Sequence, residues 1–309
     1  VMEHIIHTTN LTRNFGQLTA IDALNLAIQP GEIFGLVGAD GAGKTTTLRI
    51  LAGVLSINGG EAWVVGKSLA TDAEQVKPHI GYMAQQFSLY GDLSVIENLA
   101  FFADIYDVTG IVREERTQYL LEFAKLTQFR NRRAQHLSGG MQKKLALAST
   151  LIHQPEILLL DEPTTGVDPV SRREFWDILT ELHLGGTTIV ISTPYMDEAE
   201  RCTRVALLHN GRLIRSDKPR EIQNSVEGDV IQLTPENWQT ALRQIKKIPS
   251  VLEVQTYGNR LHVLLTPGED NLSYLESELD KRAIHHSGLE RAPMRMEEAF
   301  ISVVSKLEK

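Results

Sequence analysis

Apolar residues form two different patterns along the first 160 positions, and each pattern predicts a different kind of strand. From Leu18 to Ile28 apolar positions alternate with polar or small ones, the period of a strand with one exposed face. Residues 33–37 and 157–160 are apolar throughout, as in strands of a parallel sheet that helices cover on both faces. The pattern therefore predicts an antiparallel layer followed by a parallel α/β core.

Helical periodicity fills much of the remaining chain. Ser94 and Glu97 have the spacing of a capping box, and apolar residues then continue one face at intervals of three and four up to residue 106. The same box recurs at Ser171 and Glu174 before a second apolar stripe. We expect both stripes to pack into the core rather than to line a ligand site.

A smaller second domain is predicted beyond residue 224. The turn pair Asn210-Gly211 separates two apolar runs and predicts a hairpin near the end of the first domain. After residue 225 the pattern predicts strand, helix, strand, strand, helix, strand and a final helix, with Thr234-Pro235 opening the first of these helices. This order resembles a split βαββαβ unit. We expect domains at 1–224 and 225–309, with a helical subdomain at about 87–155.

Composition and charge exclude several classes of protein. The 309 residues are 42% hydrophobic and 23% charged, as in a globular chain large enough for two cores. The net charge of −8 argues against a nucleic-acid partner, because such proteins carry a basic field. The single cysteine, Cys202, suits a reducing compartment and is interpreted as a small buried residue. The N-terminal residues lack a signal pattern, and no apolar run approaches the roughly 20 residues of a membrane helix, so we expect peripheral membrane association at most.

Residues 38–45 match the phosphate-binding loop pattern G-x-x-x-x-G-K-[ST] directly after the first buried strand. Glycines allow backbone amides to turn toward phosphates, while Lys44 supplies a positive charge and Thr45 a magnesium ligand. The predicted nucleotide-binding residues of this loop are Gly38, Asp40, Gly41, Ala42, Gly43, Lys44, Thr45 and Thr46.

The second buried strand ends in Asp161-Glu162. An acidic residue at this position typically holds magnesium through water, so Asp161 is a predicted metal residue. Glu162, one residue further, is placed to polarise an attacking water. This pair is a weak signal by itself, since acidic residues commonly close strands.

The hexapeptide Leu137-Ser138-Gly139-Gly140-Met141-Gln142 lies between these two halves. Ser138 is a good N-cap, and Gly139 and Gly140 leave the first amides of a helix open to a phosphate. In this order, with the loop before it and the acidic pair after it, the hexapeptide looks like the signature motif of ATP-binding cassette (ABC) ATPases.

The resemblance to ABC ATPases covers about the first 220 positions and assigns further roles. It implies that Phe15 stacks on adenine, that Gln85 contacts magnesium and water, and that Asp168 lies in a loop by which two ATPase halves touch. In this family two cassettes sandwich two ATP molecules, each held by the loop of one chain and by the signature helix of the other. The implied cofactors are ATP and Mg²⁺, and the implied partner is a second copy or a paralogous ATPase subunit.

The resemblance also implies a fold class and a cellular setting. The fold class is α/β: a P-loop ATPase core with a mostly parallel sheet, an antiparallel β layer and a helical subdomain, plus a small α+β C-terminal domain. The region after residue 225, including 296–300, is similar to the extension of drug-resistance-type exporters. Residues 86 to about 106 resemble the region that receives the coupling helices of an integral-membrane permease. The chain is then expected to be peripheral, on the cytoplasmic face of the inner (plasma) membrane.

One position departs from the family pattern. Before the stretch Tyr195-Met196-Asp197 the family has a histidine that contacts the γ-phosphate, whereas this chain has Pro194. Proline has neither a side-chain donor nor a backbone N–H. The resemblance therefore predicts normal ATP binding with slow hydrolysis by the isolated chain.

Two alternatives to a transporter subunit stay open at this stage. The first is a soluble ABC protein that acts on ribosomes, DNA or cluster assembly, and the second is a cassette that binds ATP without turnover. DNA-repair relatives insert a long coiled coil between the two halves of the site. Lys44 and Asp161 are only 117 positions apart (161 − 44), which leaves no room for one.

Overall fold

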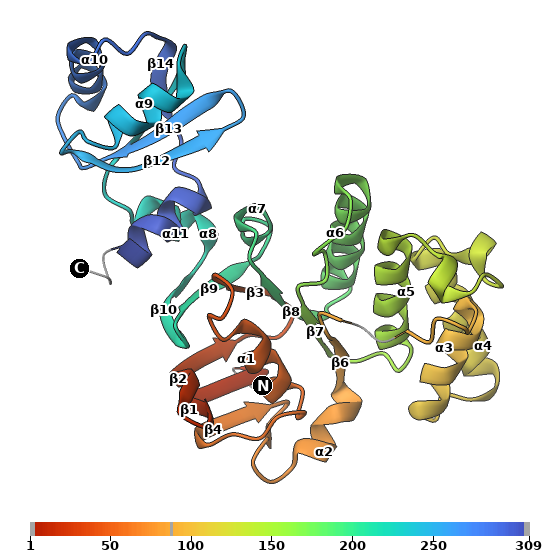
Figure 1. Ribbon diagram of the computed structural model, residues 1–309. Helices are drawn as coiled ribbons and strands as arrows, with labels where there is room; N and C mark the ends of the chain where they lie inside the picture. The colour runs from red at the N-terminus through yellow and green to blue at the C-terminus, as the bar shows by residue number, and fades with distance from the viewer. Residues whose placement is uncertain (1–3, 87–88, 306–309) are drawn as a thin grey trace. The chain divides into compact units, whose positions relative to one another are not determined.

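The computed structural model describes residues 4–86 and 89–305, and the chain divides into two compact units, Val1–Ser216 and Asp217–Lys309 (Figure 1). The sequence prediction placed the division after residue 224, so helix α8 (Pro219–Asn224) is grouped here with the second unit. Residues 1–3 and 306–309, at the outer ends of the two expected domains, lie outside the described residues. So do residues 87 and 88, at the start of the expected helical subdomain and within the expected permease-contact stretch.

A four-stranded antiparallel sheet opens the first unit. Its strand order is β2-β1-β4-β5, and in the β1–β2 pair Ile6 lies opposite Ile28. The alternation seen in the sequence is present, because Leu24, Leu26 and Ile28 are buried while Asn25 is exposed. The strands are β1 (Ile6–Phe15), β2 (Leu18–Ile28), β4 (Gly59–Val64) and β5 (Lys67–Ser68).

A six-stranded sheet forms the centre of the unit, with strand order β10-β9-β3-β8-β7-β6. All of its neighbouring pairs from β9 to β6 are parallel. Strands β3 and β7 are buried at every position, as their continuous apolar runs predicted. The strands are β3 (Ile33–Val37), β6 (Ile80–Met83), β7 (Ile157–Asp161), β8 (Thr188–Thr193), β9 (Arg204–His209) and β10 (Arg212–Asp217).

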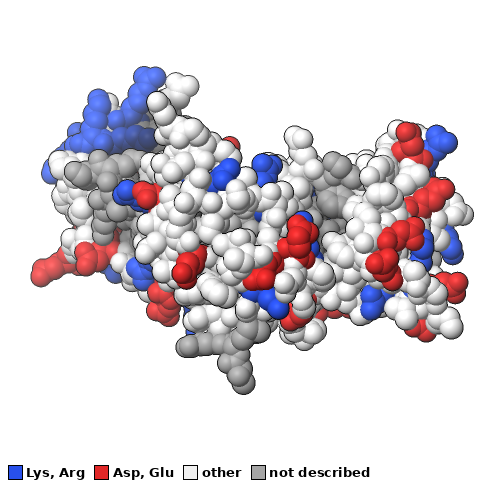
Figure 2. All heavy atoms as spheres, turned by 90° about the horizontal axis from the view of Figure 1, so that it is seen from below, with Lys and Arg blue, Asp and Glu red and all other residues white. Residues whose placement is uncertain are grey.

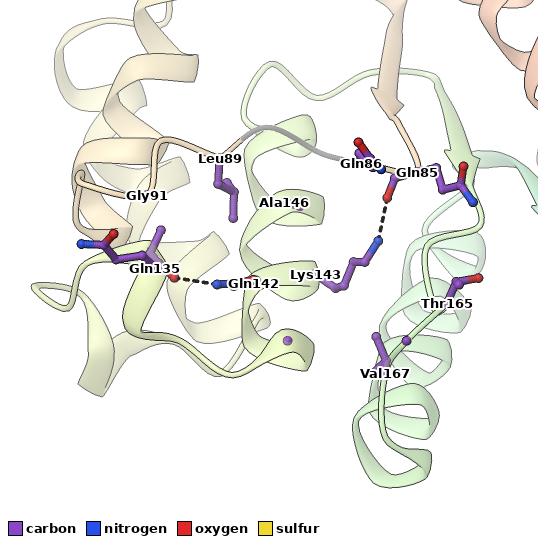
Figure 3. A pocket seen from close by; sticks show the side chains of 13 residues that line it. Gln85, Gln86, Leu89, Gly91, Gln135, Gln142, Lys143, Ala146, Thr165 and Val167 are labelled. Carbon is purple, nitrogen blue, oxygen red and sulfur yellow. Dashed lines mark hydrogen bonds between the residues drawn. The ribbon is translucent and has the colours of Figure 1, made fainter.

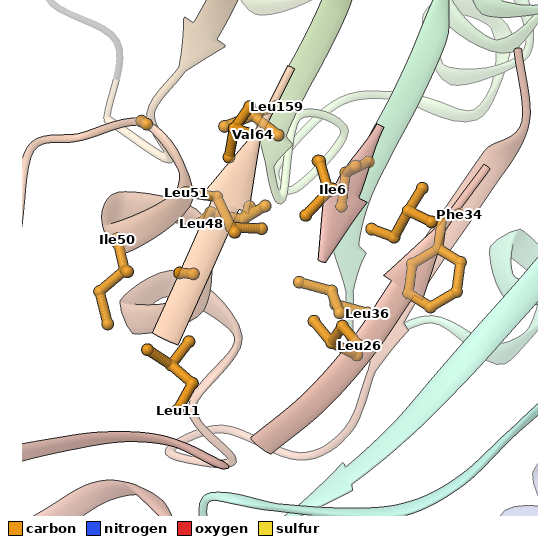
Figure 4. Close-up of a cluster of buried hydrophobic side chains, with 14 of the residues drawn as sticks. Ile6, Leu11, Leu26, Phe34, Leu36, Leu48, Ile50, Leu51, Val64 and Leu159 are labelled. Carbon is orange, nitrogen blue, oxygen red and sulfur yellow. The ribbon is translucent and has the colours of Figure 1, made fainter. Parts of the chain in front are cut away.

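The core of the first unit fills the space between the two sheets. Helix α1 (Lys44–Leu51) packs on β7 and β8 of the large sheet and on β2 and β4 of the antiparallel sheet. Ile6, Phe34, Leu48 and Leu159 are fully buried in this cluster (Figure 4). Full burial of each such side chain stabilises the fold by about 1.5–3 kcal/mol. The packing therefore holds the carboxyl ends of β3 and β7 in a fixed position relative to α1.

Helices beyond β6 form the helical part of this unit (Figure 1). The capping box predicted at the start of α3 is confirmed: Ser94 Oγ accepts from Glu97 N, and the Glu97 carboxylate accepts from Ser94 N at 2.7 Å. Helix α5 packs on both α3 and β6. The elements are α3 (Val95–Ile105), α4 (Gly110–Phe123), η2 (Thr127–Phe129), η3 (Ala134–His136) and α5 (Gly139–Leu151).

The second predicted capping box is wrong. Helix α6 (Pro169–Leu184) starts before Ser171, and its N-cap is Asp168, whose carboxylate accepts from the backbone N–H groups of Val170 and Ser171. The reason is that proline is favoured at the first helical position, where its missing N–H has no helical partner to lose. The sequence Asp168-Pro169 therefore starts the helix three residues earlier than Ser171-Glu174 would.

Short elements complete the first unit. The predicted hairpin at Asn210-Gly211 is confirmed, since the two residues have φ values of 48° and 78° and join the neighbouring strands β9 and β10. Two consecutive positive φ angles are typical of a type I′ hairpin turn. The remaining elements are α2 (Ala73–Val76), η1 (Lys77–His79) and α7 (Met196–Ala199).

The second unit contains a four-stranded antiparallel sheet of order β12-β13-β11-β14. This order and the element sequence confirm the predicted split βαββαβ unit. Ala241 and Ile245 of α9 and Leu275 and Leu279 of α10 bury one face of the sheet. The elements are β11 (Asp229–Pro235), α9 (Trp238–Ile245), β12 (Val251–Tyr257), β13 (Arg260–Leu265), α10 (Asn271–Lys281), β14 (His286–Ala292) and α11 (Met296–Ser305).

The prediction that Thr234-Pro235 opens a helix is wrong. Both residues belong to the end of β11, where Pro235 pairs with His286. Helix α9 begins at Trp238, because the Asn237 side chain accepts from Thr240 N and caps the helix. A proline is tolerated at this last strand position because the ladder ends there.

None of the helices in residues 4–86 and 89–305 is long and apolar enough to cross a membrane. On the face drawn in Figure 2 most acidic side chains are interspersed with basic and uncharged ones. The two sheets of the first unit and the α+β second unit together confirm the predicted fold class.

Candidate functional site

The phosphate-binding loop follows β3 and leads directly into α1. Gly43, the N-cap of α1, has φ 101°, and a Cβ at this position would lie 2.7 Å from the carbonyl oxygen of Ala20. Both the left-handed backbone and the close approach of β2 therefore require glycine. The loop is thus held between the carboxyl end of β3 and the neighbouring strand β2.

The ammonium of Lys44 lies inside this loop. Its Nζ donates to the carbonyl oxygens of Gly38 at 2.9 Å and Ala39 at 3.1 Å, and it lies 3.5 Å from Glu162 Oε1. The side chain is only 4% exposed. A buried charge is costly unless it is paired, so these three oxygens stabilise an ammonium placed to meet a phosphate.

Asp161 ends β7 and is fully buried. Its Oδ1 accepts from Thr45 Oγ1 at 3.0 Å and from Ser192 Oγ at 2.7 Å. Its Oδ2 has no hydrogen-bond partner among the described residues, although an unsatisfied buried oxygen typically costs about 1–3 kcal/mol. Magnesium prefers oxygen ligands and retains several waters. The oxygens of Thr45 and Asp161 therefore fit a magnesium ion, and Gln85 lines the same pocket as Thr45.

Glu162 adopts a backbone conformation that is rare for its residue type. Its φ is 44°, which costs on the order of 1–3 kcal/mol outside glycine. Its N–H donates to Ser192 O and Ser192 Oγ, on the neighbouring strand β8. Its Oε2 accepts from Gln85 Nε2 at 2.9 Å and from Thr165 Oγ1 at 3.4 Å. The strained turn and these bonds orient the carboxylate next to Lys44 and Gln85.

A pocket of about 630 Å³ surrounds these groups. Its lining includes Phe15 and most of the predicted loop residues, together with Gln85 and the predicted base Glu162. Phe15 is 46% exposed, and the guanidinium of Arg13 lies over its ring at 4.8 Å. The lining residues are Phe15, Leu18, Thr19, Ala20, Asp40, Gly41, Gly43, Lys44, Thr45, Thr46, Gln85, Glu162, Thr165, Pro194 and Tyr195.

The other predicted residues do not line this pocket in the part of the chain that the structure describes. Gly38 and Ala42 belong to the loop backbone behind it, and Ala42 is buried. Ser138 caps α5 by accepting from Met141 N, and Asp168 caps α6. Gly140 packs so tightly against α6 that a Cβ there would lie 2.4 Å from Ser171 Oγ.

Gly139 is open, by contrast, since a Cβ on it would meet no atom within 4 Å among the described residues. It lines a separate groove of about 380 Å³. Residues 138–140 thus present a helix N-terminus away from the Lys44 pocket of the same chain.

Several residues of the pocket were not predicted from the sequence. Thr165 could have been found, because it lies in the turn after Glu162, with its N–H donating to Glu162 O at 3.2 Å. Tyr195 lines the pocket with Arg172 4.6 Å from its ring centre. Lys143 lines the neighbouring groove rather than this pocket, and it donates to Gln85 O at 3.1 Å. Burial lowers the pKa of Lys143, and the nearby carboxylates of Asp161 and Glu162 oppose this shift only in part. No local sequence signal marks Lys143, since its contact spans two elements.

Pro194 borders the pocket because of strand order. It follows β8, which lies between β3 and β7 in the sheet. The two preceding hydroxyls already donate elsewhere: Thr193 Oγ1 to Glu198 Oε2 at 2.6 Å and Ser192 Oγ to Asp161. Neither hydroxyl is therefore free to replace the contact with the γ-phosphate that the family pattern assigns to a histidine at position 194.

The central sheet carries a phosphate-binding loop at the end of one strand and an acidic pair at the end of another, and a helix that starts with two glycines lies in the helical part of the same unit. These features define a nucleotide-binding ATPase cassette. A family model described as "ABC transporter" matches residues 21–165. The Nod factor export ATP-binding protein I of Cupriavidus pinatubonensis (strain JMP 134 / LMG 1197) is 33% identical over 304 residues, covering 98% of this chain and 91% of that protein. The chain belongs to the family of ABC transporter ATP-binding proteins, as the sequence motifs predicted.

Further relatives agree with this assignment. The probable multidrug ABC transporter ATP-binding protein YbhF of Escherichia coli (strain K12) is 41% identical over 227 residues, or 74% of this chain. This chain spans only 39% of the length of that relative. Among solved structures, cbiO1 from Clostridium perfringens, part of the ABC transporter complex cbiONQ, has a TM-score of 0.67 at 26% identity, covering 72% of this chain and 92% of that one. A dimeric cassette bound to ADP and Pi in a post-hydrolysis state has a TM-score of 0.63 at 27% identity over 69% of this chain and 98% of its own.

Proposed function

We propose that this chain is the ATP-binding and ATP-hydrolysing subunit that powers an integral-membrane permease, in the direction of export. The observation that carries the proposal is the meeting of Lys44 and Gln85 at the Glu162 carboxylate, at 3.5 Å and 2.9 Å, beside the phosphate-binding loop. One pocket thus contains a cation that can bind phosphate (Lys44), a candidate base (Glu162) and a polar side chain that orients this base (Gln85). The names of two relatives, which refer to multidrug and Nod factor export, support the direction.

Each group of residues in the pocket has a distinct role in the proposed ATP hydrolysis. The loop amides and Lys44 bind the phosphates, and the exposed ring of Phe15 offers a stacking surface for adenine. Thr45, Asp161 and Gln85 would hold magnesium, which supplies positive charge to the phosphate oxygens when bound. Glu162 accepts a proton from the attacking water, and Gln85 and Thr165 hold its carboxylate in place.

A second chain completes each site in this proposal. The helix N-terminus at residues 138–140 lies outside the Lys44 pocket, and Gly139 is open. Amides at a helix N-terminus favour an anion, so these residues fit the phosphates of a nucleotide held by a partner chain. The partner is a second copy or a paralogous subunit, and Asp168 lies in the loop between the two.

The permease places the subunit at the cytoplasmic face of the inner (plasma) membrane as a peripheral protein.

A second candidate function, a cassette that binds ATP with weak turnover, is favoured by one observation. Pro194 offers no hydrogen-bond donor, and Ser192 and Thr193 donate to other groups. In this case the permease or a paralogous subunit restores the rate.

Two measurements test the proposal. Purification of the chain from membranes of its own host, followed by identification of the proteins that co-purify, should recover an integral-membrane protein. Retention by ribosomes instead would contradict it. Light scattering of Glu162→Gln with saturating Mg-ATP should reveal a dimer that disappears without nucleotide. A monomer under these conditions, with and without the co-purified partner, would contradict the two-chain site.

A further inference from the structure

Lys143 connects the helical part of the first unit to the catalytic pocket. It lies in the second turn of α5, and its Nζ donates to the main-chain oxygen of Gln85 at 3.1 Å. Figure 3 shows this side chain pointing from α5 toward Gln85. Lys143, Gln85 and Thr165 all line the groove of about 380 Å³. The contact joins two segments that are 58 residues apart in the chain.

Gln85 is held at both ends by groups with opposite charge. Its main-chain oxygen accepts from the Lys143 ammonium, and its side-chain amide donates to Glu162 Oε2 at 2.9 Å. These are the hydrogen bonds of Gln85 among the described residues. Gln85 also lies two residues beyond the end of β6 at Met83, so the strand ladder does not fix it. The direction in which its amide points therefore depends on both contacts.

The next residue in the chain, Lys144, differs from Lys143 in what its ammonium contacts. Lys144 Nζ pairs with Glu174 on α6 at 2.9 Å and is almost fully buried. Lys143 is half-buried instead, and it is attracted electrostatically by the carboxylates of Asp161 and Glu162. Among the described residues, the only hydrogen bond of Lys143 is the one to the main-chain oxygen of Gln85, a residue that lines the pocket.

We propose that Lys143 is a positioning residue that holds Gln85 in the orientation in which its amide orients the Glu162 carboxylate. The inference rests on the proposed ATP hydrolysis. Lys143 is carried by the helix whose first turn contains Gly139 and Gly140. A displacement of α5 thus moves the Gln85 main chain and changes the orientation of Glu162, so the hydrolysis rate depends on where α5 lies. ATP binding by the loop and Lys44 does not depend on it.

Three variants separate this role from a general effect on folding. Lys143→Met removes the ammonium and keeps most of the apolar stem, whereas Lys143→Arg keeps a charged donor. Lys125→Met is the matched control, because Lys125 is a lysine of the same helical region with a 68% exposed side chain. Single-turnover hydrolysis of Mg-ATP, nucleotide affinity and the thermal midpoint are measured for the full chain.

We expect Lys143→Met to lower the single-turnover rate about tenfold, the size of a lost charged hydrogen bond. ATP affinity should stay within about twofold, as expected when a residue outside the binding groups is changed. Lys143→Arg should recover most of the rate, and Lys125→Met should match the wild type. A rate for Lys143→Met equal to that of Lys125→Met would overturn the inference. So would a loss of ATP affinity that parallels a fall in thermal midpoint in both Lys143 variants.

A double-mutant cycle with Gln85→Ala tests the route of the effect. This variant retains the main-chain oxygen that Lys143 contacts and removes the amide that contacts Glu162. If Lys143 acts through that amide, Lys143→Met should add little to the loss caused by Gln85→Ala. Losses that multiply would overturn the inference. A wild-type chain that binds ATP but shows no single-turnover hydrolysis would instead contradict the proposed function, and the inference with it.

Discussion

Lys44 Nζ and Glu162 Oε1 lie 3.5 Å apart, with side chains that are only 4% and 9% exposed. The two groups follow different strands: Lys44 begins α1 after the loop that follows β3, and Glu162 comes directly after β7. If Lys44 binds phosphate as we propose, we expect an incoming phosphate to compete with Glu162 for the ammonium and to leave the carboxylate to act on water. The same ion pair would then link nucleotide binding to the placement of the proposed base.

Substitution of the two partners should have separate effects. Lys44→Ala should largely abolish ATP binding, because it removes the phosphate charge. Glu162→Gln should preserve binding and lower turnover about 10²- to 10⁴-fold, as expected when a general base is lost. Titration with a fluorescent nucleotide and measurement of phosphate release distinguish the two. Equal loss of binding in both variants would show that Glu162 is not the base.

Pro194→His should raise the hydrolysis rate of the isolated chain at unchanged ATP affinity. A preorganised donor to developing charge contributes about 2.7–4 kcal/mol, or roughly 10²- to 10³-fold in rate. Pro194→Ala is the control, because it restores the backbone N–H without a side-chain donor. A fast parent enzyme that gains nothing from the histidine would contradict this prediction, and an equal gain in Pro194→Ala would assign the effect to the backbone.

Acid should destabilise the first unit through His153. The ring is stacked on Tyr106 at 3.7 Å, and burial lowers the pKa of His153 from 6.5 to about 4, against the opposing effect of its hydrogen bond to Ile80 O. The unfolded chain therefore binds a proton that the folded chain does not between these pH values, and stability is lost as pH falls from 6.5 toward 4.

The expected loss between pH 7 and pH 5 is about 1 kcal/mol, reduced from the full linkage because the ring is partly exposed. Urea unfolding of the wild type and of His153→Phe at both pH values measures it. His153→Phe keeps a ring against Tyr106 and should lose less stability in acid than the wild type. An identical decline in both proteins would rule out His153 as the cause.

The second unit should be dispensable for nucleotide binding. Every predicted phosphate, metal and catalytic residue precedes residue 217, where the structure divides the chain. A chain ending after residue 224 should remain folded and bind ATP with an affinity similar to that of the full chain, while contacts with the permease or a second subunit weaken. Circular dichroism and nucleotide titration measure this, and a folded truncated chain unable to bind ATP would contradict the division of roles.

Local sequence determined the parts of the site that are contiguous in the chain. The loop at residues 38–45, the acidic pair at Asp161 and the helix start at Ser138 could be predicted, because each depends on the backbone and caps of a few neighbouring residues. The apolar periods likewise predicted both sheets. The start of α6 was misplaced because two capping patterns overlap there, and the cap at Asp168 before Pro169 prevails over the box at Ser171.

Only the tertiary structure decided which distant residues meet. Strand order places the end of β8, and hence Pro194, between the ends of β3 and β7, and no pattern in the sequence encodes that order. The contact of Lys143 with Gln85 depends in the same way on how α5 packs beside β6. Such contacts arise from burial of apolar faces far apart in the chain, and the hydrophobic effect that drives this burial is not directional. A single sequence therefore shows which faces are buried but not which polar groups their packing brings together.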